Sequence, residues 1–333
     1  MRRSRAVAAR KAAHEGARAY NLPQVAGLKG NPAAAELSML EIKRILCPID
    51  FSEFSARAYL HALSLAEHYR SKVAAQHVVE IWRHPSASFA TSAGLYKEFC
   101  ETLRMRGEEQ LQEFVKNNRH NEIQPELVVH EGTASDSILS FAEAQKADLI
   151  VMGTHGRRGY DRLMLGSVTD RVMRRAPCPV LTVCQAPPDS EAPGEKRGHG
   201  HRLSRILFCA DFSENSERGL SHAFSATAEY DAELTLLHVV EDVPSPAQTE
   251  EAIAAATERL DKLIPTEAGK TLKIKTAVRI GKPYRQIIQL AEEAQIDLVI
   301  AGVHGYGALD PAVFGSTTYR VIQLGPCPVL VHP

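Results

Sequence analysis

Two glycine-rich stretches of the chain repeat one spacing, and that spacing suits a phosphate group. Both follow the pattern G-x2-G-x9-G-S, at Gly153, Gly156, Gly166 and Ser167 and again at Gly302, Gly305, Gly315 and Ser316. Glycine lets backbone N–H groups approach an oxyanion closely, and a Gly–Ser pair that opens a helix adds donors at the positive end of the helix dipole. The pattern is neither the Walker motif, because no GK[ST] follows, nor GxGxxG. It predicts a phosphate site in each stretch.

The two loops differ in charge, which affects how well each would hold a polyphosphate. The first loop contains three bases and one acid, Arg157, Arg158, Arg162 and Asp161. The second contains Asp310, has no Lys or Arg between Gly302 and Ser316, and is stiffened by Pro311. Guanidinium groups bind phosphate through charge-assisted hydrogen bonds. We therefore expect the first copy to bind phosphate more tightly, with Arg157 among the contacting residues.

Other ionisable side chains near these loops have two readings each. Asp50 and Asp211 end apolar runs, and Asp50 could hold Mg²⁺ through water beside the phosphates or simply accept hydrogen bonds, with both readings left open by the sequence. His155 and His304 lie inside the loops and could touch phosphate or move a proton, but a histidine bonded to the backbone is the favoured reading. We predict no protein-ligated metal site and no catalytic residue.

Four further histidines are not expected to act at the site. His77 and His238 lie in apolar strand patterns and are expected to be core histidines whose hydrogen bonds are satisfied. His199 and His201 lie in a polar stretch, and two ligands without a third make a poor metal site.

The elements that would position these residues alternate between short apolar runs and helical patterns. In the first half, apolar runs occupy 44–50, 73–80, 125–132, 147–153 and 178–183, and helical patterns occupy 52–70, 95–118, 135–146 and a segment that opens near Ser167. Strands of continuous Val, Ile and Leu are buried on both faces, which predicts parallel pairing with right-handed crossovers. We predict an α/β fold, with doubly wound, five-stranded, mostly parallel sheets and helices on both faces. Ligands of such sheets bind outside the carboxyl ends of the strands.

The chain is an internal duplication. Residues 42–80 and 203–241 share 17 identities in 39 positions at a constant offset of 161, and a second block aligns at an offset of 149. A stretch rich in Pro, Gly and charge separates the copies. We predict a basic, flexible extension over 1–40, a first domain over 41–185, a linker over 186–202 and a second domain over 203–333.

Composition excludes several classes of function. The formal charge of the 333 residues is 39 − 40 = −1, which gives no overall footprint for nucleic acid or an anionic membrane. No apolar run approaches the roughly 18 residues that span a bilayer, and the six cysteines lack CxxC spacing. We expect no secretory signal, because the N-terminal stretch has no apolar h-region. These features predict a cytoplasmic protein.

The first 30 residues are an exception to this neutral composition. They carry seven bases and one acid, 7 − 1 = +6. The favoured reading is a mobile tail, with a transit peptide, a nucleic-acid arm and a true start at Met39 as alternatives.

The glycine spacing together with the strand-end aspartates makes the chain resemble a tandem universal stress protein. The likeness covers both halves, roughly 270 residues, and fails for the tail and the linker. The resemblance implies ATP, with or without Mg²⁺, lying across the strand tips, with adenine near the first two strands and phosphates in the glycine loop. The implied binding residues are Pro48, Ile49, Asp50, Val78, Met152, Gly153, Gly156, Gly166, Ser167 and Val168 in the first copy, and Asp211, Val239, Ala301, Gly302, Gly305, Gly315, Ser316 and Thr317 in the second.

The leading functional reading is a regulatory protein that binds ATP or a related adenine nucleotide and acts in stress responses through its shape or its partners. The alternatives are a slow ATPase or phosphotransferase, with Ser167 or a histidine modified, and a nucleotide-free dimerisation module. The apolar final strand of each half is expected at a sheet edge, which proteins cover or pair. We therefore predict antiparallel pairing of residues 180–184 with 328–332 as an internal pseudo-dimer, with room for further dimerisation of the chain.

Overall fold

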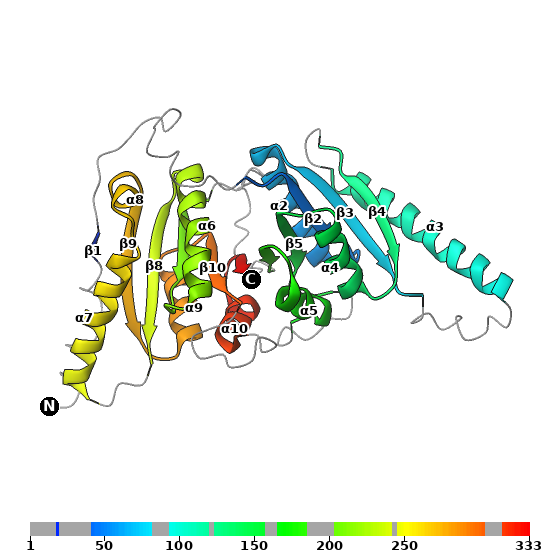
Figure 1. Cartoon of the computed structure of the whole chain (residues 1–333). Helices are drawn as coiled ribbons and strands as arrows, with labels where there is room; N and C mark the ends of the chain where they lie inside the picture. The colour runs from blue at the N-terminus through cyan, green and yellow to red at the C-terminus, as the bar shows by residue number, and fades with distance from the viewer. Residues whose placement is uncertain are drawn as a thin grey trace, which may run out of the picture. The chain divides into compact units, whose positions relative to one another are not determined.

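The computed structural model of the chain describes residues 18–19, 41–81, 93–119, 123–156, 165–184, 203–241, 245–303 and 315–333. They fall into two compact units (Figure 1). The first unit lies within residues 41–201. The second lies within 202–332 and includes the short strand β1 (Arg18–Ala19).

The first unit contains one parallel sheet in the order β6-β5-β2-β3-β4. Its strands are β2 (Arg44–Pro48), β3 (Lys72–Val79), β4 (Glu126–Glu131), β5 (Leu149–Gly153) and β6 (Val180–Val183). Its helices are α2 (Glu53–Tyr69), α3 (Ala93–Asn117), α4 (Ala134–Ala144) and α5 (Ser167–Arg175). Right-handed crossovers place α2 and α3 on one face and α4 and α5, which pack together, on the other (Figure 1).

The second unit repeats this sheet in the order β9-β8-β7-β10-β11, again parallel. Its strands are β7 (Arg205–Cys209), β8 (Glu233–Val240), β9 (Lys273–Ile280), β10 (Leu298–Gly302) and β11 (Val329–His332). Its helices are α6 (Glu214–Tyr230), α7 (Pro246–Lys262), α8 (Thr266–Thr271), α9 (Pro283–Glu293) and α10 (Ser316–Leu324). The predicted α/β class with two doubly wound, five-stranded sheets is thus confirmed.

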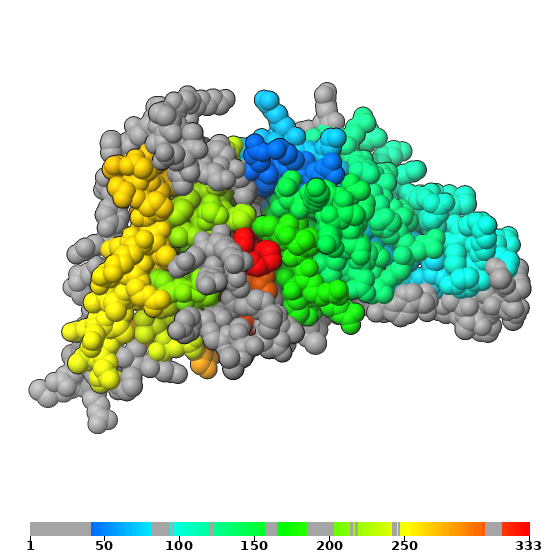
Figure 2. All heavy atoms as spheres, viewed as in Figure 1, coloured from blue at the N-terminus to red at the C-terminus, as the bar shows by residue number. Residues whose placement is uncertain are grey.

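Two elements of the second unit were not predicted from the sequence. The strand β1 pairs antiparallel with β9, in the register Arg18 to Thr276. The short helix α8 follows α7, and Figure 2 shows these two helices in yellow and orange-yellow on the surface of the unit. The remainder of the predicted extension over 1–40, and the predicted linker, lie outside the described residues.

The central strands are buried because their side chains are apolar on both faces. Ile45, Leu46 and Ile150 of the first unit are at most 1% exposed, as are Ile206 and Leu207 of the second. Such burial on both sides is typical of a parallel sheet covered by two helical layers. The cysteines are free thiols, and four of the six are buried, where a thiol packs as a small hydrophobe.

A carboxylate at the start of the fourth strand clamps the start of the first strand in each unit. Asp148 Oδ2 accepts hydrogen bonds from the backbone N–H groups of Lys43 and Arg44, both at 2.8 Å. Asp297 does the same for Ser204 and Arg205, at 2.8 and 2.9 Å. The repeated "DL" and "RIL" sequences therefore encode the same hydrogen-bonded clamp at the amino edge of each sheet.

No helix among the described residues is both long enough and apolar enough to cross a membrane.

Candidate functional site

The order of strands reverses between β2 and β5 in the first unit and between β7 and β10 in the second. In open α/β sheets, ligands bind outside the carboxyl ends of the strands at this point. There Asp50 follows the last residue of β2 by two positions, and Asp211 follows the last residue of β7 by two. A methyl group built on Gly156 would lie 2.7 Å from Oδ2 of Asp50, so the glycine loop and the aspartate are in direct contact.

Both glycine loops are closed by the same two hydrogen bonds. In the first unit, the N–H of Gly166 donates to the carbonyl of Thr154 at 2.9 Å, and Thr169 Oγ1 donates to the carbonyl of Gly153 at 2.9 Å. In the second unit, Gly315 donates to Val303 at 3.0 Å, and Thr318 Oγ1 donates to Gly302 at 2.9 Å. These bonds fix the start of a helix beside the end of a strand.

The helices that start at these closures have no side-chain cap. Gly166 is the N-cap of α5 and Gly315 is the N-cap of α10, and neither position makes a side-chain capping bond. The first N–H groups of a helix lack intrahelical partners and carry the positive end of the dipole. Ser167 and Ser316 are exposed at these starts, so an anion could reach the donors around them.

The first turns of the two helices differ in charge. The first turn of α5 contains Asp170, whose carboxylate pairs with Arg174 at 2.9 Å. The first turn of α10 contains no acidic residue. The start of α10 is therefore the more positive of the two by sequence.

The residue after each strand-end aspartate has a strained backbone. Phe51 has a φ of 66° and Phe212 a φ of 61°, a left-handed conformation that is uncommon for aromatic residues. The preceding Asp50 accepts hydrogen bonds at Oδ1 from Ser52 N and Oγ at 3.0 and 2.6 Å. Asp211 makes the same two bonds with Ser213. The hydrogen-bonding reading of these aspartates is thus confirmed for one carboxylate oxygen.

A histidine packs under each of these phenylalanines. The His77 ring lies 4.4 Å from that of Phe51, and its Nδ1–H donates to the carbonyl of Ile49 at 2.8 Å. In the second unit, His238 lies 4.4 Å from Phe212 and donates to Ala210 at 2.7 Å. Both histidines thus have a hydrogen-bond partner, as predicted, but the prediction that they lie in the core is wrong, because both are only half-buried.

The two units differ on the outer side of the phenylalanine. In the first, Phe114 of α3 lies edge-on to Phe51 at 5.8 Å, and a hollow of about 320 Å³ opens between them and Gln110, Glu113 and Asn117. In the second, the guanidinium carbon of Arg259 lies 3.9 Å from the centroid of Phe212. Burial lowers the pKa of His238, and the charge of Arg259 lowers it further.

His155 has a different hydrogen bond from the predicted one. Its Nδ1 lies 2.9 Å from Thr154 Oγ1, so the described partner is a hydroxyl and not a backbone group. The ring is buried and lies 5.1 Å from that of Phe54. His155 is therefore buried beside Phe54, directly after the end of β5.

The structure places the described members of the predicted set at one edge of each sheet. They occupy the ends of strands and the starts of helices, at Pro48, Ile49, Asp50, Val78, Met152, Gly153, Gly156, Gly166, Ser167 and Val168, and at Asp211, Val239, Ala301, Gly302, Gly315, Ser316 and Thr317. Ile49 and Met152 are buried, so they would meet a ligand through their backbone.

Several predicted residues lie outside the described residues. They are Arg157, Arg158, Asp161, Arg162, His199, His201, His304, Gly305, Asp310 and Pro311. Their expected contribution stays a prediction.

The sequence did not indicate the residues that support the glycine loops and the strand-end aspartates. Thr169 and Thr318 close the loops, and Phe51 and Phe212 turn the chain after the aspartates. The threonines occupy matching positions in the two copies, at an offset of 149, and this repetition was the available signal.

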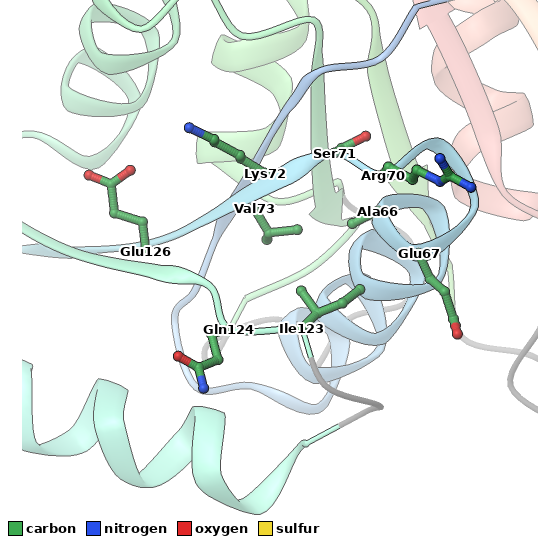
Figure 3. A pocket seen from close by; sticks show the side chains of 9 residues that line it. All are labelled: Ala66, Glu67, Arg70, Ser71, Lys72, Val73, Ile123, Gln124 and Glu126. Carbon is green, nitrogen blue, oxygen red and sulfur yellow. The ribbon is translucent and has the colours of Figure 1, made fainter.

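A hollow of about 720 Å³ lies elsewhere, at the amino ends of β3 and β4 (Figure 3). Ala66, Val73 and Ile123 form its apolar part, and charged side chains that include Arg70 and Glu126 surround it. It lies at the opposite edge of the sheet from the glycine loop. Ligands of this fold class bind at the carboxyl edge, so we assign the candidate site to the glycine loop.

Within the ranges that the structure describes, no group of three or more His, Cys, Asp and Glu side chains could hold a metal ion.

Each unit is therefore a doubly wound α/β domain with a glycine loop that closes beside a strand-end carboxylate. A model of the universal stress protein family matches residues 41–183 and 203–333. The chain belongs to the universal stress protein family, with two copies of the domain.

Individual relatives agree with this assignment. The chain is 37% identical over 141 residues to universal stress protein MJ0531 of Methanocaldococcus jannaschii. The match covers 42% of this chain and 81% of that protein. It is 30% identical over 196 residues to universal stress protein Mb2028c of Mycobacterium bovis, and that match spans only 62% of the relative's length. The crystal structure of a universal stress protein from Archaeoglobus fulgidus matches 88% of this chain and 97% of its own, with a TM-score of 0.60 and 21% identity, which supports the fold alone.

Proposed function

We propose that each unit binds an adenine nucleotide, ATP in the first instance, and that the protein acts as a regulator through the bound state. One observation carries the proposal: in both units the same pair of hydrogen bonds sets an uncapped helix start beside the end of the fourth strand. A helix start of this kind binds phosphate oxygens through backbone N–H groups. The half-buried strand ends of β2 and β3 provide the neighbouring surface for a base and a ribose.

The contact between Gly156 and Asp50 gives the test. A side chain on Gly156 would displace the Asp50 carboxylate from the closed loop, so Gly156→Val should weaken nucleotide binding to the first unit about tenfold or more, as expected for lost hydrogen bonds to a charged ligand. Gly94→Ala is the control, because a methyl group there meets nothing within 4 Å.

Calorimetry with ATP and native mass spectrometry would measure affinity and the number of bound nucleotides. The intact chain should hold two, and the Gly156 variant should hold one, with the affinity of the second unit. An intact chain that binds no adenine nucleotide would contradict the proposal. Release of phosphate over many turnovers would show that the protein hydrolyses ATP. Hydrolysis would then replace regulation as the proposed function.

A further inference from the structure

Two arginines surround one tyrosine where the helices α9 and α10 of the second unit meet. Arg285 Nε donates to the hydroxyl of Tyr284 at 3.0 Å. The guanidinium carbon of Arg320 lies 4.6 Å from the centroid of the same ring. Tyr284 is half-buried, whereas both arginines are exposed. The cluster, Tyr284, Arg285 and Arg320, thus presents two positive charges around one neutral phenol.

The arginine cluster lies at the carboxyl edge of the sheet, where the glycine loop closes. Tyr284 is in the first turn of α9, and the adjoining Gly281 donates to the carbonyl of Val240, the last residue of β8. Arg320 follows Ser316 by one helical turn on α10, which packs against α9 (Figure 1). Side chains of a helix lean toward its N-terminus, so Arg320 leans toward the start of α10.

The positive charge of the arginine cluster has no carboxylate to neutralise it in the part of the chain that the structure describes. The first unit shows the contrast, because there Asp136 pairs with Arg175 at 3.1 Å and Asp170 pairs with Arg174 at 2.9 Å. At an offset of 149, Arg285 replaces Asp136 and Tyr319 replaces Asp170. The second unit has therefore exchanged two acids on this surface for a base and a neutral residue, and Gln323 and Leu324 replace the bases Arg174 and Arg175 with which those acids pair.

We propose that Arg285 and Arg320 bind the phosphate tail of the ligand in the second unit, in place of the arginines that its glycine loop lacks. The loop between Gly302 and Ser316 contains no Lys or Arg, whereas the first loop contains three arginines. Guanidinium groups held near one another repel, and a polyphosphate that bridges them removes that repulsion while it accepts charge-assisted hydrogen bonds. The inference rests on the proposed nucleotide site and names the residues that select for its phosphates.

The pKa of the Tyr284 hydroxyl responds to the positive charges of the two arginines. The hydrogen bond from Arg285, together with the charges of both arginines, lowers the pKa of Tyr284 because the phenolate is stabilised. The same arrangement stabilises a phosphate oxygen at that point. A bound anion would neutralise the arginines, so it should raise the pKa of Tyr284.

The test measures binding of inorganic tripolyphosphate, ATP and adenosine to the full chain by calorimetry. The double variant Arg285→Ala with Arg320→Ala should lose about tenfold or more in affinity for tripolyphosphate and ATP at one site, with adenosine unchanged. The matched control is Lys262→Ala with Lys270→Ala, which removes the same charge from the second unit at exposed ion pairs with Glu258 and Glu267. Thermal melting would show that both double variants are folded.

A spectroscopic measurement separates binding from a general loss of charge. The ultraviolet titration signal of Tyr284 is identified as the one that is missing from Tyr284→Phe. Tripolyphosphate should shift this signal to higher pH in the unsubstituted chain and in the lysine control. The inference is overturned if ATP binds two sites with unchanged affinity in the arginine variant, and the proposed function then still stands. If tripolyphosphate binding depends on the arginines but no nucleotide binds, the anion site stands and the proposed function fails.

Discussion

Arg259 and His238 form the clearest electrostatic pair at the candidate site of the second unit. Burial is the main cause that lowers the pKa of His238 from 6.5, the hydrogen bond with Ala210 opposes the shift, and Arg259 adds to it. The folded protein thus favours neutral imidazole, and the unfolded chain binds more protons near that pH. The contribution of His238 to stability is present above pH 6.5 and is lost as the pH falls toward the lowered pKa.

Replacement of Arg259 should move the pKa of His238 back toward 6.5. Arg259→Ala removes a nearby positive charge and uncovers Phe212, and both changes favour the imidazolium form. NMR titration of the His238 ring would measure the shift. Lys262→Ala, which removes a charge three residues further along α7, is the control. An unchanged pKa of His238 in Arg259→Ala would contradict this prediction and would show that the charge of Arg259 does not contribute to the shift.

At the scale of elements, the end of β5 is pressed against the first turn of α2. A methyl group on Gly153 would lie 2.7 Å from the Cβ of Phe54 and 2.9 Å from its carbonyl carbon. Because one of these contacts is backbone, a change of rotamer cannot relieve the overlap. The glycine therefore sets how closely α2 approaches the sheet behind the candidate site.

Gly153→Ala should lower the free energy of unfolding by about 1–3 kcal/mol, the usual effect of overpacking a core. Gly94→Ala, in the helix α3 with no atom within 4 Å, should be neutral or raise it by about 0.5–1 kcal/mol. Denaturant unfolding of both variants would measure the difference. Equal stabilities would show that α2 shifts without cost.

Elements with a repeated apolar pattern could be predicted from the sequence, and elements without one could not. The pattern over 95–118 predicts a helix, and α3 spans Ala93–Asn117. The helix α8 has the sequence TEAGKT, which shows no apolar period, and β1 is two residues whose partner strand lies more than 250 positions away. Such elements form because of tertiary contacts that no local pattern encodes.

The candidate site shows the same division. The glycines and aspartates could be placed because their spacing is repeated at fixed offsets. The different partners of the two phenylalanines, Phe114 in the first unit and Arg259 in the second, could not be predicted. The helices α3 and α7 lie where the two copies do not align at either offset. The arginine cluster was likewise hidden, because it needs the packing of α9 on α10 to bring Tyr284 and Arg320 together.

At the scale of the whole molecule, the last strand of each copy is the outermost strand of its own unit's sheet. β6 lies beyond β5 in the first unit, and β11 lies beyond β10 in the second. The predicted pairing of these strands within one chain stays a prediction. Its physical basis is that an apolar outer strand is a liability that proteins cover or pair.

The half-chain 41–185 should therefore dimerise when it is expressed alone, because its apolar strand Val180–Val183 would otherwise face solvent. Sedimentation over a range of concentrations would measure this, with the full chain as the comparison. A half that remains monomeric at high concentration would contradict the edge argument.

The aspartate clamp at the amino edge affects how the chain reaches its native state. Asp148 closes on a backbone N–H 104 residues earlier in the chain, and Asp297 on one 92 residues earlier. Pairings so distant in sequence form late and slowly during folding. The two clamps use the same chemistry on the same "RIL" strand, so while the chain is still folding, Asp297 can also capture the strand that belongs to Asp148. The duplication that gives the molecule two candidate sites thus also gives it two similar sets of strands, and we expect competition between them to make refolding of the full chain less efficient than refolding of a single copy.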